Sequence, residues 1–347
     1  MTDIAPQLIG LFGDRLKERE PLAKYTNFRL GGPARWFVDA KTVEEIQQAV
    51  GIAEKAGVEW FVLGGGSNTL VSDEGFQGLV IRVVMRHHVI GGTTIVAEAG
   101  VISAALARAT AEAGLAGFTW AISLPGTIGG AVRGNAGCFG GEMRDVVKSV
   151  QVLRCIPPLP ESPPLAGSRP EAGGGQGGVG ACDMIELSNK DLKFGYRESA
   201  IKHSNDIVLS VTLELKRGDV AALRRELEEK LSRRKATQPL YAGSAGCMFK
   251  NFEFKNEKDL EKLKKEVDIP SEMLRAKRLS CGWLIDQMDL KGKKIGGAEI
   301  SPEHGNFVIN VGGATADDVV QLAAYVKTQA SNRFGIQLQE EVQYLGF

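Results

Sequence analysis

The sequence predicts an α+β fold, and three observations support this. Short apolar runs are typical of strands, amphipathic stretches at helical spacing lie between them, and glycine clusters punctuate both. Because strand-like and helix-like segments alternate in the first part of the chain, helices are expected to punctuate a sheet there. The chain has 347 residues, 43% of them apolar, which suffices for two or three domains with a sizeable core.

The first helix has the clearest predicted boundaries. Thr42 and Glu45 have the spacing of a capping box, apolar residues then recur at helical spacing, and Gly57 stands where a helix-terminating glycine belongs. A Gly-Gly-Pro turn and a strand at 34–38 precede this helix. Beyond it, strands are predicted at 60–63, 78–84 and 94–97, and an alanine-rich helix at 102–113.

A first glycine loop, Gly64-Gly65-Gly66-Ser67-Asn68, directly follows the apolar run 60–63. Three glycines leave backbone N–H groups uncovered, and the serine and asparagine side chains add donors, so the loop suits a pyrophosphate. A glycine-rich hairpin turn without a ligand is the alternative interpretation. The Rossmann and P-loop patterns do not fit, because an apolar strand follows the loop and no Lys-Ser/Thr pair is present.

A second loop, 124–138, contains Gly126, Gly129, Gly130, Gly134 and Gly137. Each glycine costs roughly 0.5–1 kcal/mol inside a regular element, so this density predicts neither helix nor strand. Residues this small let the backbone approach a flat or extended ligand, although close packing of backbone on backbone is an alternative. Two such loops in one domain favour a nucleotide cofactor.

The middle of the chain predicts a hairpin with a long insertion. Strands at 147–154 and 184–187 flank a proline- and glycine-rich stretch, 156–181, which we interpret as a disordered insertion of no assigned function. A strand at 207–215 follows, and the composition changes near Gly218. We therefore expect an N-terminal extension at 1–23, one domain at 24–218 and another at 219–347.

The last third predicts mainly helices. Asp219 caps a helix that ends in a run of basic residues, Arg233-Arg234-Lys235, which by itself is typical of a solvated face. A charged helix at 257–267 follows, and Thr315 caps a last helix that stops near Gly335. The chain is expected to close on a strand at 336–345 that carries two glutamates.

Composition excludes several classes of protein. Forty-two basic and 42 acidic residues give a formal net charge of zero, so no nucleic-acid or anionic-membrane partner is expected. We see no signal peptide and no apolar run long enough to span a bilayer. The five cysteines are odd in number and lack C-x-x-C spacing, which favours reduced thiols in a cytoplasm over disulfides, and no metal site is predicted. A monomer is expected.

Six motifs together resemble the UDP-N-acetylenolpyruvoylglucosamine reductase family, a bacterial family of peptidoglycan-precursor enzymes. The resemblance runs from about Tyr25 to the end, apart from the insertion. In order along the chain, the motifs are 63–68, 124–131 with Asn135-Ala136-Gly137, 196–199, 246–251, 282–287 and 291–298.

The resemblance implies an FAD-binding domain of the vanillyl-alcohol oxidase (PCMH) type in two α/β lobes, followed by an α+β substrate-binding domain. It implies non-covalent FAD, since none of the four histidines lies in a glycine loop. NADPH would reduce FAD, and flavin N5 would pass hydride to UDP-N-acetylglucosamine enolpyruvate to give UDP-N-acetylmuramate.

Residue roles follow from the same resemblance. The catalytic residues would be Arg197, Cys247 and Glu341, with Arg197 stabilising charge beside the substrate carboxylate and Glu341 sharing that work if protonated. The implied cofactor-binding residues are Leu63, Gly64, Gly65, Gly66, Ser67, Asn68, Pro125, Gly126, Thr127, Gly130, Asn135 and Gly137. The implied substrate-binding residues are Tyr196, Lys235, Asn251 and Gln287, with Lys235 at the diphosphate.

Cys247 departs from the family, in which many members have a proton-donating serine at this place. A thiol of pKa about 8.5 is a competent proton donor, but activity is then expected to fall as the thiol ionises. The alternative is an inert residue and a catalytically silent nucleotide-binding regulator. Another alternative is a flavin oxidase of the same fold that uses oxygen; the motifs around Cys247 and Glu341 argue against it.

Overall fold

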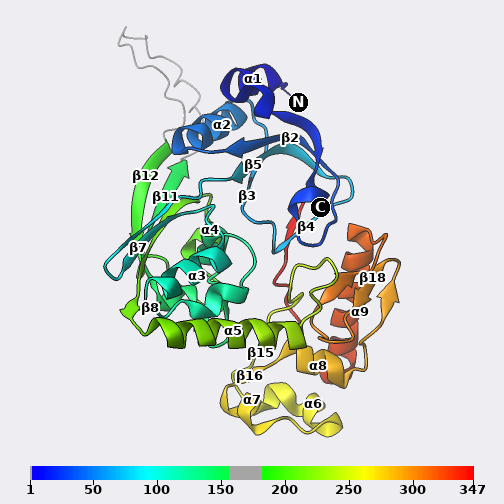
Figure 1. The fold of residues 1–347 in the computed structure, drawn as a ribbon. Coiled ribbons are helices and arrows are strands. Elements are labelled where there is room, and N and C mark those ends of the chain that lie inside the picture. The colour runs from blue at the N-terminus through cyan, green and yellow to red at the C-terminus, as the bar shows by residue number, and fades with distance from the viewer. Residues whose placement is uncertain (1, 156–181) are drawn as a thin grey trace, which may run out of the picture.

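The computed structural model describes residues 2–155 and 182–347, and its fold begins with a four-stranded sheet covered by two helices (Figure 1). The strand order is β1-β2-β5-β3, with β1 antiparallel to β2 and the other neighbours parallel. The elements are α1 (Ala5–Phe12), β1 (Lys17–Pro21), β2 (Pro33–Ala40), α2 (Val43–Lys55), β3 (Trp60–Leu63) and β5 (Phe76–Val83).

The predicted boundaries of α2 are confirmed. The Thr42 hydroxyl accepts a hydrogen bond from the backbone N–H of Glu45 at 3.2 Å, which satisfies a donor of the first turn. Gly57 follows the helix in the left-handed conformation, with φ of 64°. Buried Ile46 and Val50 share one core with Trp36 of the sheet. The sequence alone thus located this helix correctly.

A five-stranded antiparallel sheet in the order β12-β11-β13-β7-β6 forms the second lobe. Helix α4 packs against β7 and β13, whereas α3 and α5 pack against each other and against the short helix η3. The buried side chains of the sheet join those of the first sheet in one continuous core (Figure 1). The elements are β6 (His88–Gly91), β7 (Thr94–Glu98), α3 (Ser103–Glu112), α4 (Ile128–Arg133), β11 (Val147–Cys155), β12 (Cys182–Ser188), β13 (Ile207–Glu214) and α5 (Val220–Thr237).

Two predictions for this lobe are wrong. The second glycine loop contains a short helix, α4, because Ile128, Ala131 and Val132 are buried and their packing outweighs the low helix propensity of glycine. Cys155 and Cys182 form a disulfide instead of remaining reduced. They are directly opposite in the β11–β12 ladder, a proximity that no cysteine count reveals. The predicted hairpin is confirmed, whereas its insertion at 156–181 lies outside the described residues.

The C-terminal part has its own core around α8 and α9, next to a three-stranded sheet, β17-β18-β19. Thr315 caps α9 as predicted, and Gly335 ends it in the left-handed conformation. The predicted helix at 257–267 is a 3₁₀ turn, Glu257–Leu260, followed by α6. The elements are β15 (Phe252–Glu253), α6 (Glu261–Glu266), α7 (Ser271–Arg275), β16 (Arg278–Leu279), α8 (Cys281–Gln287), β17 (Lys294–Ile295), β18 (Ala298–Ile300), β19 (Val308–Asn310) and α9 (Ala316–Phe334).

The chain end returns to the first lobe. Strand β20 (Gln343–Leu345) pairs in parallel with β4 (Thr69–Val71), which directly follows the first glycine loop (Figure 1). The predicted strand at 336–345 is therefore wrong in length, because the residues before Gln343 cross between the two parts of the molecule. A second contact joins the N-terminal and C-terminal parts of the molecule in the same region. The Asp73 carboxylate accepts hydrogen bonds from two N–H groups in the first turn of α9, at 2.9 and 3.1 Å.

Short elements complete the chain. They are η1 (Gly13–Arg15), η2 (Leu22–Tyr25), β8 (Leu115–Ala116), η3 (Thr119–Ser123), β9 (Gly137–Cys138), β10 (Gly141–Glu142), η4 (Met143–Asp145), η5 (Ala200–His203) and β14 (Lys216–Arg217). Within residues 2–155 and 182–347, no helix is long and apolar enough to cross a membrane.

Candidate active site

The two glycine loops lie against each other. A Cβ on Gly65 would come within 2.5 Å of Gly126 Cα, and one on Gly126 within 2.5 Å of Ser67 Oγ, so only glycine fits at either position. Ser67 Oγ donates a hydrogen bond to the Pro125 carbonyl at 3.2 Å. A Cβ on Gly64 would approach Thr127 Oγ1 at 2.7 Å. Backbone packing therefore explains some of these glycines without a ligand.

Other features of the same loops fit a cofactor with a pyrophosphate. In the described part of the chain, the N–H groups of Gly65, Gly66 and Ser67 donate no hydrogen bond to another residue, nor do those of Thr127 and Gly130. Uncovered N–H groups on two adjoining loops are the donors that a diphosphate requires. Gly130 is also not explained by packing, since a Cβ there would meet nothing closer than 3.8 Å. The loops thus leave both donors and space for FAD.

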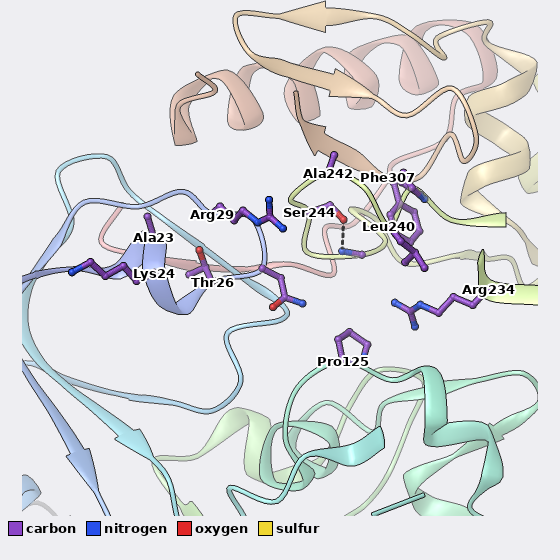
Figure 2. Close-up of a pocket in the computed structure, with 13 residues that line it drawn as sticks. Ala23, Lys24, Thr26, Arg29, Pro125, Arg234, Leu240, Ala242, Ser244 and Phe307 are labelled. Atoms are coloured by element: carbon purple, nitrogen blue, oxygen red, sulfur yellow. Dashed lines mark hydrogen bonds between the residues drawn. The ribbon is translucent and has the colours of Figure 1, made fainter. Parts of the chain in front are cut away.

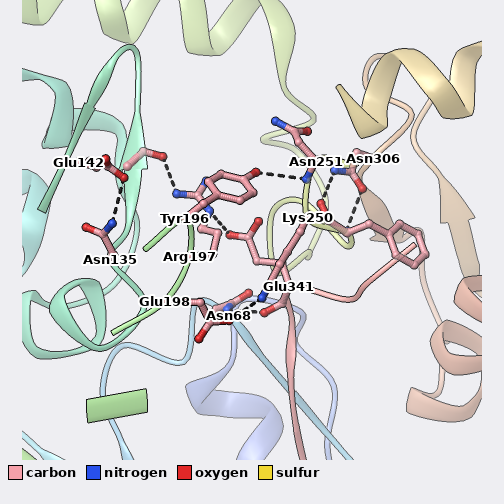
Figure 3. A network of polar contacts seen from close by, with 12 residues as sticks. Asn68, Asn135, Glu142, Tyr196, Arg197, Glu198, Lys250, Asn251, Asn306 and Glu341 are labelled. Atoms are coloured by element: carbon pink, nitrogen blue, oxygen red, sulfur yellow. Dashed lines mark hydrogen bonds and ion pairs between the residues drawn. The ribbon is translucent and has the colours of Figure 1, made fainter. Parts of the chain in front are cut away.

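The two asparagines expected at the cofactor are used within the protein. Asn68 Nδ2 donates to the Glu341 carbonyl at 3.0 Å. Asn135 is fully buried, and its Nδ2 donates to Glu142 Oε2 at 2.9 Å and to the Gly195 carbonyl at 2.8 Å (Figure 3). Both amides therefore position other parts of the site.

Arg197 and Glu341 form an ion pair next to these loops, with Nε and Oε1 2.7 Å apart (Figure 3). Arg197 Nη1 also donates to the Gly137 carbonyl of the second loop, at 3.0 Å. The chain therefore brings together residues 144 positions apart in sequence. Burial raises the pKa of Glu341 above its ordinary value, against the lowering effect of Arg197.

Cys247 lies beside this pair. Its neighbour Met248 accepts a hydrogen bond from the Glu341 N–H at 2.8 Å, and the charges of Arg197 and Glu341 both act on the thiol. Burial raises the pKa of Cys247 to about 12, and Glu341 adds to this effect. The thiol therefore keeps its proton throughout the neutral range, unlike the ordinary thiol assumed from the sequence.

Tyr196 and Asn251 join the two parts of the molecule at the same place. The Tyr196 hydroxyl accepts from the Asn251 N–H at 3.1 Å (Figure 3). Asn251 Oδ1 accepts from the N–H of Cys281 at the start of α8, at 3.0 Å. The guanidinium of Arg278 lies over the Tyr196 ring, 4.2 Å from its centroid. The predicted substrate residues Tyr196 and Asn251 are thus next to Arg197.

A pocket of about 750 Å³ opens between the lobes (Figure 2). Among the described residues, three basic side chains line it, those of Lys24, Arg29 and Arg234, and no acidic one does. Figure 2 shows the Arg234 side chain reaching from the end of α5 toward Pro125. Burial lowers the pKa of Arg234, and within the described residues only the thiols of Cys138 and Cys247 act to raise it. A half-buried cation without a carboxylate partner suits an anionic ligand.

Lys235, the cation chosen from the sequence, does not line this pocket and is exposed. The helical period contains a signal that would have found Arg234 instead. Leu223, Leu227 and Leu231 mark the inward face of α5, and position 234 lies on that face whereas position 235 lies off it. The side chain of Gln287, at the end of α8, makes no hydrogen bond within the described residues. Leu63 is buried at the end of β3.

Comparisons with known proteins agree with this architecture. Residues 34–155 match the family described as FAD binding domain, and residues 238–345 match the C-terminal domain of UDP-N-acetylenolpyruvoylglucosamine reductase. Proteins described as UDP-N-acetylenolpyruvoylglucosamine reductase include one from Alkaliphilus metalliredigens (strain QYMF), 34% identical over 98% of this chain and 97% of the relative. One from Desulfosudis oleivorans (strain DSM 6200 / JCM 39069 / Hxd3) is 36% identical over 98% and 97%.

A solved structure supports the same assignment. The crystal structure of UDP-N-acetylenolpyruvylglucosamine reductase (MurB) from Thermus caldophilus superposes with a TM-score of 0.69 at 31% identity, covering 95% of this chain and 99% of that one. The fold and its paired glycine loops define an FAD-dependent oxidoreductase. More particularly, the chain belongs to the UDP-N-acetylenolpyruvoylglucosamine reductase family. The resemblance found in six motifs and the two-part fold expected from it are confirmed.

Proposed function

We propose that this protein reduces the enolpyruvyl group of UDP-N-acetylglucosamine enolpyruvate with NADPH, producing UDP-N-acetylmuramate. The main support is the convergence of a cation, a carboxyl group and a thiol beside the cofactor loops: the Arg197–Glu341 pair at 2.7 Å, with Cys247 next to it. An enolpyruvyl ether needs this set, since its reduction places negative charge beside a carboxylate and then requires a proton.

The proposed reaction adds one hydride and one proton to the double bond of the substrate. When bound, FAD supplies a hydride, received from NADPH, to the terminal carbon of the double bond, whose electron pair shifts to the carbon beside the carboxylate. Arg197 stabilises the charge that develops there, and Glu341 assists in its protonated form. Cys247 donates its thiol proton to that carbon and is reprotonated from solvent. Each turnover consumes one NADPH and one proton.

The pocket supplies the nucleotide end of the proposed substrate site. Arg234 is the better candidate for the diphosphate than Lys235, because it lines the pocket and lacks a carboxylate partner within the described chain. Tyr196 and Asn251 lie next to the Arg197–Glu341 pair and would orient the sugar end. Gln287 is retained as a further substrate contact. With domains at 24–218 and 219–347, the flavin would bind to the first and much of the substrate to the second.

A spectroscopic titration tests the proposal. The purified protein should show a flavin absorbance band that bleaches on anaerobic addition of NADPH and returns on addition of enolpyruvyl-UDP-N-acetylglucosamine. UDP-N-acetylglucosamine, which lacks the double bond, is the matched control and should leave the band bleached. Recovery with oxygen but not with the enolpyruvyl compound would indicate an oxidase. A colourless protein that takes up no added FAD would refute the proposal.

A further inference from the structure

Glu198, the residue after Arg197, belongs to a cluster of charged side chains that takes no direct part in the proposed reaction. We propose that Glu198, with Lys250 and Lys202, is a positioning device that holds Arg197 against Glu341 and balances the charge around that pair. This inference rests on the proposed function, because it assigns these three residues an effect on the same reaction.

The geometry begins with a strained turn. Glu198 N–H donates to the Gly195 carbonyl at 3.1 Å, which closes a four-residue turn with Tyr196 and Arg197 at its centre. Arg197 has φ of 59°, a left-handed conformation at a turn position that ordinarily takes glycine or asparagine. Such a conformation persists only where surrounding contacts enforce it, and it accumulates at functional sites. In this turn, Tyr196 meets Asn251 and Arg197 meets Glu341 (Figure 3).

Lys202 and Asn135, both in the second lobe, hold the turn from one side. Lys202 Nζ donates to the Arg197 carbonyl at 2.9 Å and pairs with Glu198 Oε1 at 3.2 Å. Asn135 Nδ2 donates to the Gly195 carbonyl at 2.8 Å. The carbonyls of Gly195 and Arg197 therefore both accept hydrogen bonds from side chains outside the turn.

Lys250, in the C-terminal part of the molecule, holds the turn from the other side. Its Nζ lies 2.6 Å from Glu198 Oε1, and only 17% of its side chain is exposed (Figure 3). The backbone N–H of Lys250 donates to the Gln339 carbonyl at 2.8 Å, two residues before Glu341. Lys250 also follows Cys247 by three positions. One ion pair therefore ties the arginine turn to the segments that carry the thiol and the carboxyl group.

The same cluster sets the charge near Glu341. Lys202 and Lys250, together with Arg197, lower the pKa of Glu341, against the stronger effect of burial. Partial burial would raise the pKa of Glu198, but hydrogen bonds from Lys250, His203 and Lys202 lower it to about 2, so it stays ionised. Its negative charge offsets the two lysines.

Other titratable groups also face this site. The thiol of Cys247 and the phenol of Tyr196 lie beside Glu341, and burial raises the pKa of both, so they remain neutral. Arg133 of α4 lies behind Lys202, whose carbonyl accepts from its Nη2 at 3.3 Å. The positive charge around Glu341 therefore comes from arginine and lysine, and Glu198 is the acid that balances it.

Opposite charge changes test the inference. Glu198→Gln leaves the lysines unbalanced, which favours the ionised form of Glu341; Lys250→Met does the reverse. If Glu341 acts protonated, the alkaline fall in the rate of flavin reoxidation by enolpyruvyl-UDP-N-acetylglucosamine should move to lower pH in the first variant and to higher pH in the second. In both variants the rate of flavin reoxidation should drop by about tenfold to a hundredfold, since a misplacement of a reacting group by about 1 Å has such effects. Stopped-flow absorbance measures this rate and its pH dependence. The rate of flavin reduction by NADPH should not change.

Two further variants separate charge from geometry. Glu198→Asp keeps the charge with a shorter reach, so its rate should fall while the pH profile stays in place. Glu198→Gln/Lys250→Met should return the profile toward that of the wild type. The control is Glu266→Gln, which removes an exposed ion pair with Arg333 (3.3 Å) in the C-terminal part and should alter neither quantity.

The outcomes are distinguishable. Shifts in the same direction for Glu198→Gln and Lys250→Met, or none in either, would overturn the inference while leaving the proposed function intact. A wild-type protein whose reduced flavin is not reoxidised by the enolpyruvyl compound would refute the proposed function, and this inference with it.

Discussion

Replacing Cys247 with alanine gives the sharpest prediction about the reaction. The thiol lies beside Arg197 and Glu341, and its pKa of about 12 keeps it protonated at neutral pH. Loss of a positioned acid typically reduces a rate by about 10²–10⁴-fold, which corresponds to roughly 3–5 kcal/mol in the barrier. We expect Cys247→Ala to lose that much in flavin reoxidation by the enolpyruvyl substrate and nothing in flavin reduction by NADPH.

Serine at the same position should preserve activity, because a hydroxyl donates a proton from nearly the same place. The structure also predicts the pH dependence. A pKa raised to about 12 means that the proton is present below that pH and is lost only as pH rises through it, so Cys247 should cause no fall in rate near pH 8.5. Stopped-flow absorbance between about pH 6 and 10 measures both effects.

Cys281→Ala is the matched control. This thiol is buried near Cys247, and its pKa is also raised by burial, but among the described residues the charges of Arg197 and Glu341, which act on Cys247, do not act on it. Its removal should leave proton transfer intact. The reasoning is wrong if Cys247→Ala reoxidises flavin at the wild-type rate, or if an alkaline fall near pH 8.5 disappears in Cys247→Ser.

Three other predictions follow from the fold and the pocket. Arg234→Gln should raise the KM for the UDP substrate about tenfold to a hundredfold, whereas Lys235→Gln should leave it unchanged, in steady-state assays; equal effects would contradict the pocket assignment. Thiol titration of the unreduced, denatured protein should find three free thiols of the five cysteines, because Cys155 and Cys182 are paired; five would refute the disulfide. Asp73→Ala should lower the free energy of unfolding by about 2 kcal/mol in urea denaturation, since two N–H groups of α9 lose a charged acceptor; Asp317→Ala, which leaves these bonds in place, should have a smaller effect.

Local sequence patterns predicted the elements that depend on neighbouring residues. The caps at Thr42, Asp219 and Thr315 each accept from the N–H three residues on, because a capping side chain reaches only its own first turn. Helical period and turn glycine define such helices without any distant contact. Six motifs in order were also enough to recognise the family.

Other features of the fold depend on tertiary contacts, which local sequence patterns do not record. The Cys155–Cys182 disulfide depends on strand register, and α4 forms in a glycine-rich loop because its apolar side chains are buried. The last segment crosses between the two parts of the molecule and ends in a short strand, because β20 pairs with β4, almost three hundred residues away in the chain.

The site shows the same division. The sequence by itself indicated Arg197, Cys247 and Glu341 as candidate catalytic residues and the two glycine loops as the candidate cofactor site. Only the tertiary structure paired Arg197 with Glu341, turned Arg234 rather than Lys235 into the pocket, and raised the pKa of the Cys247 thiol. The physical reason is that proximity and burial arise when distant segments pack together, whereas a motif records the identity of its residues and not what surrounds them.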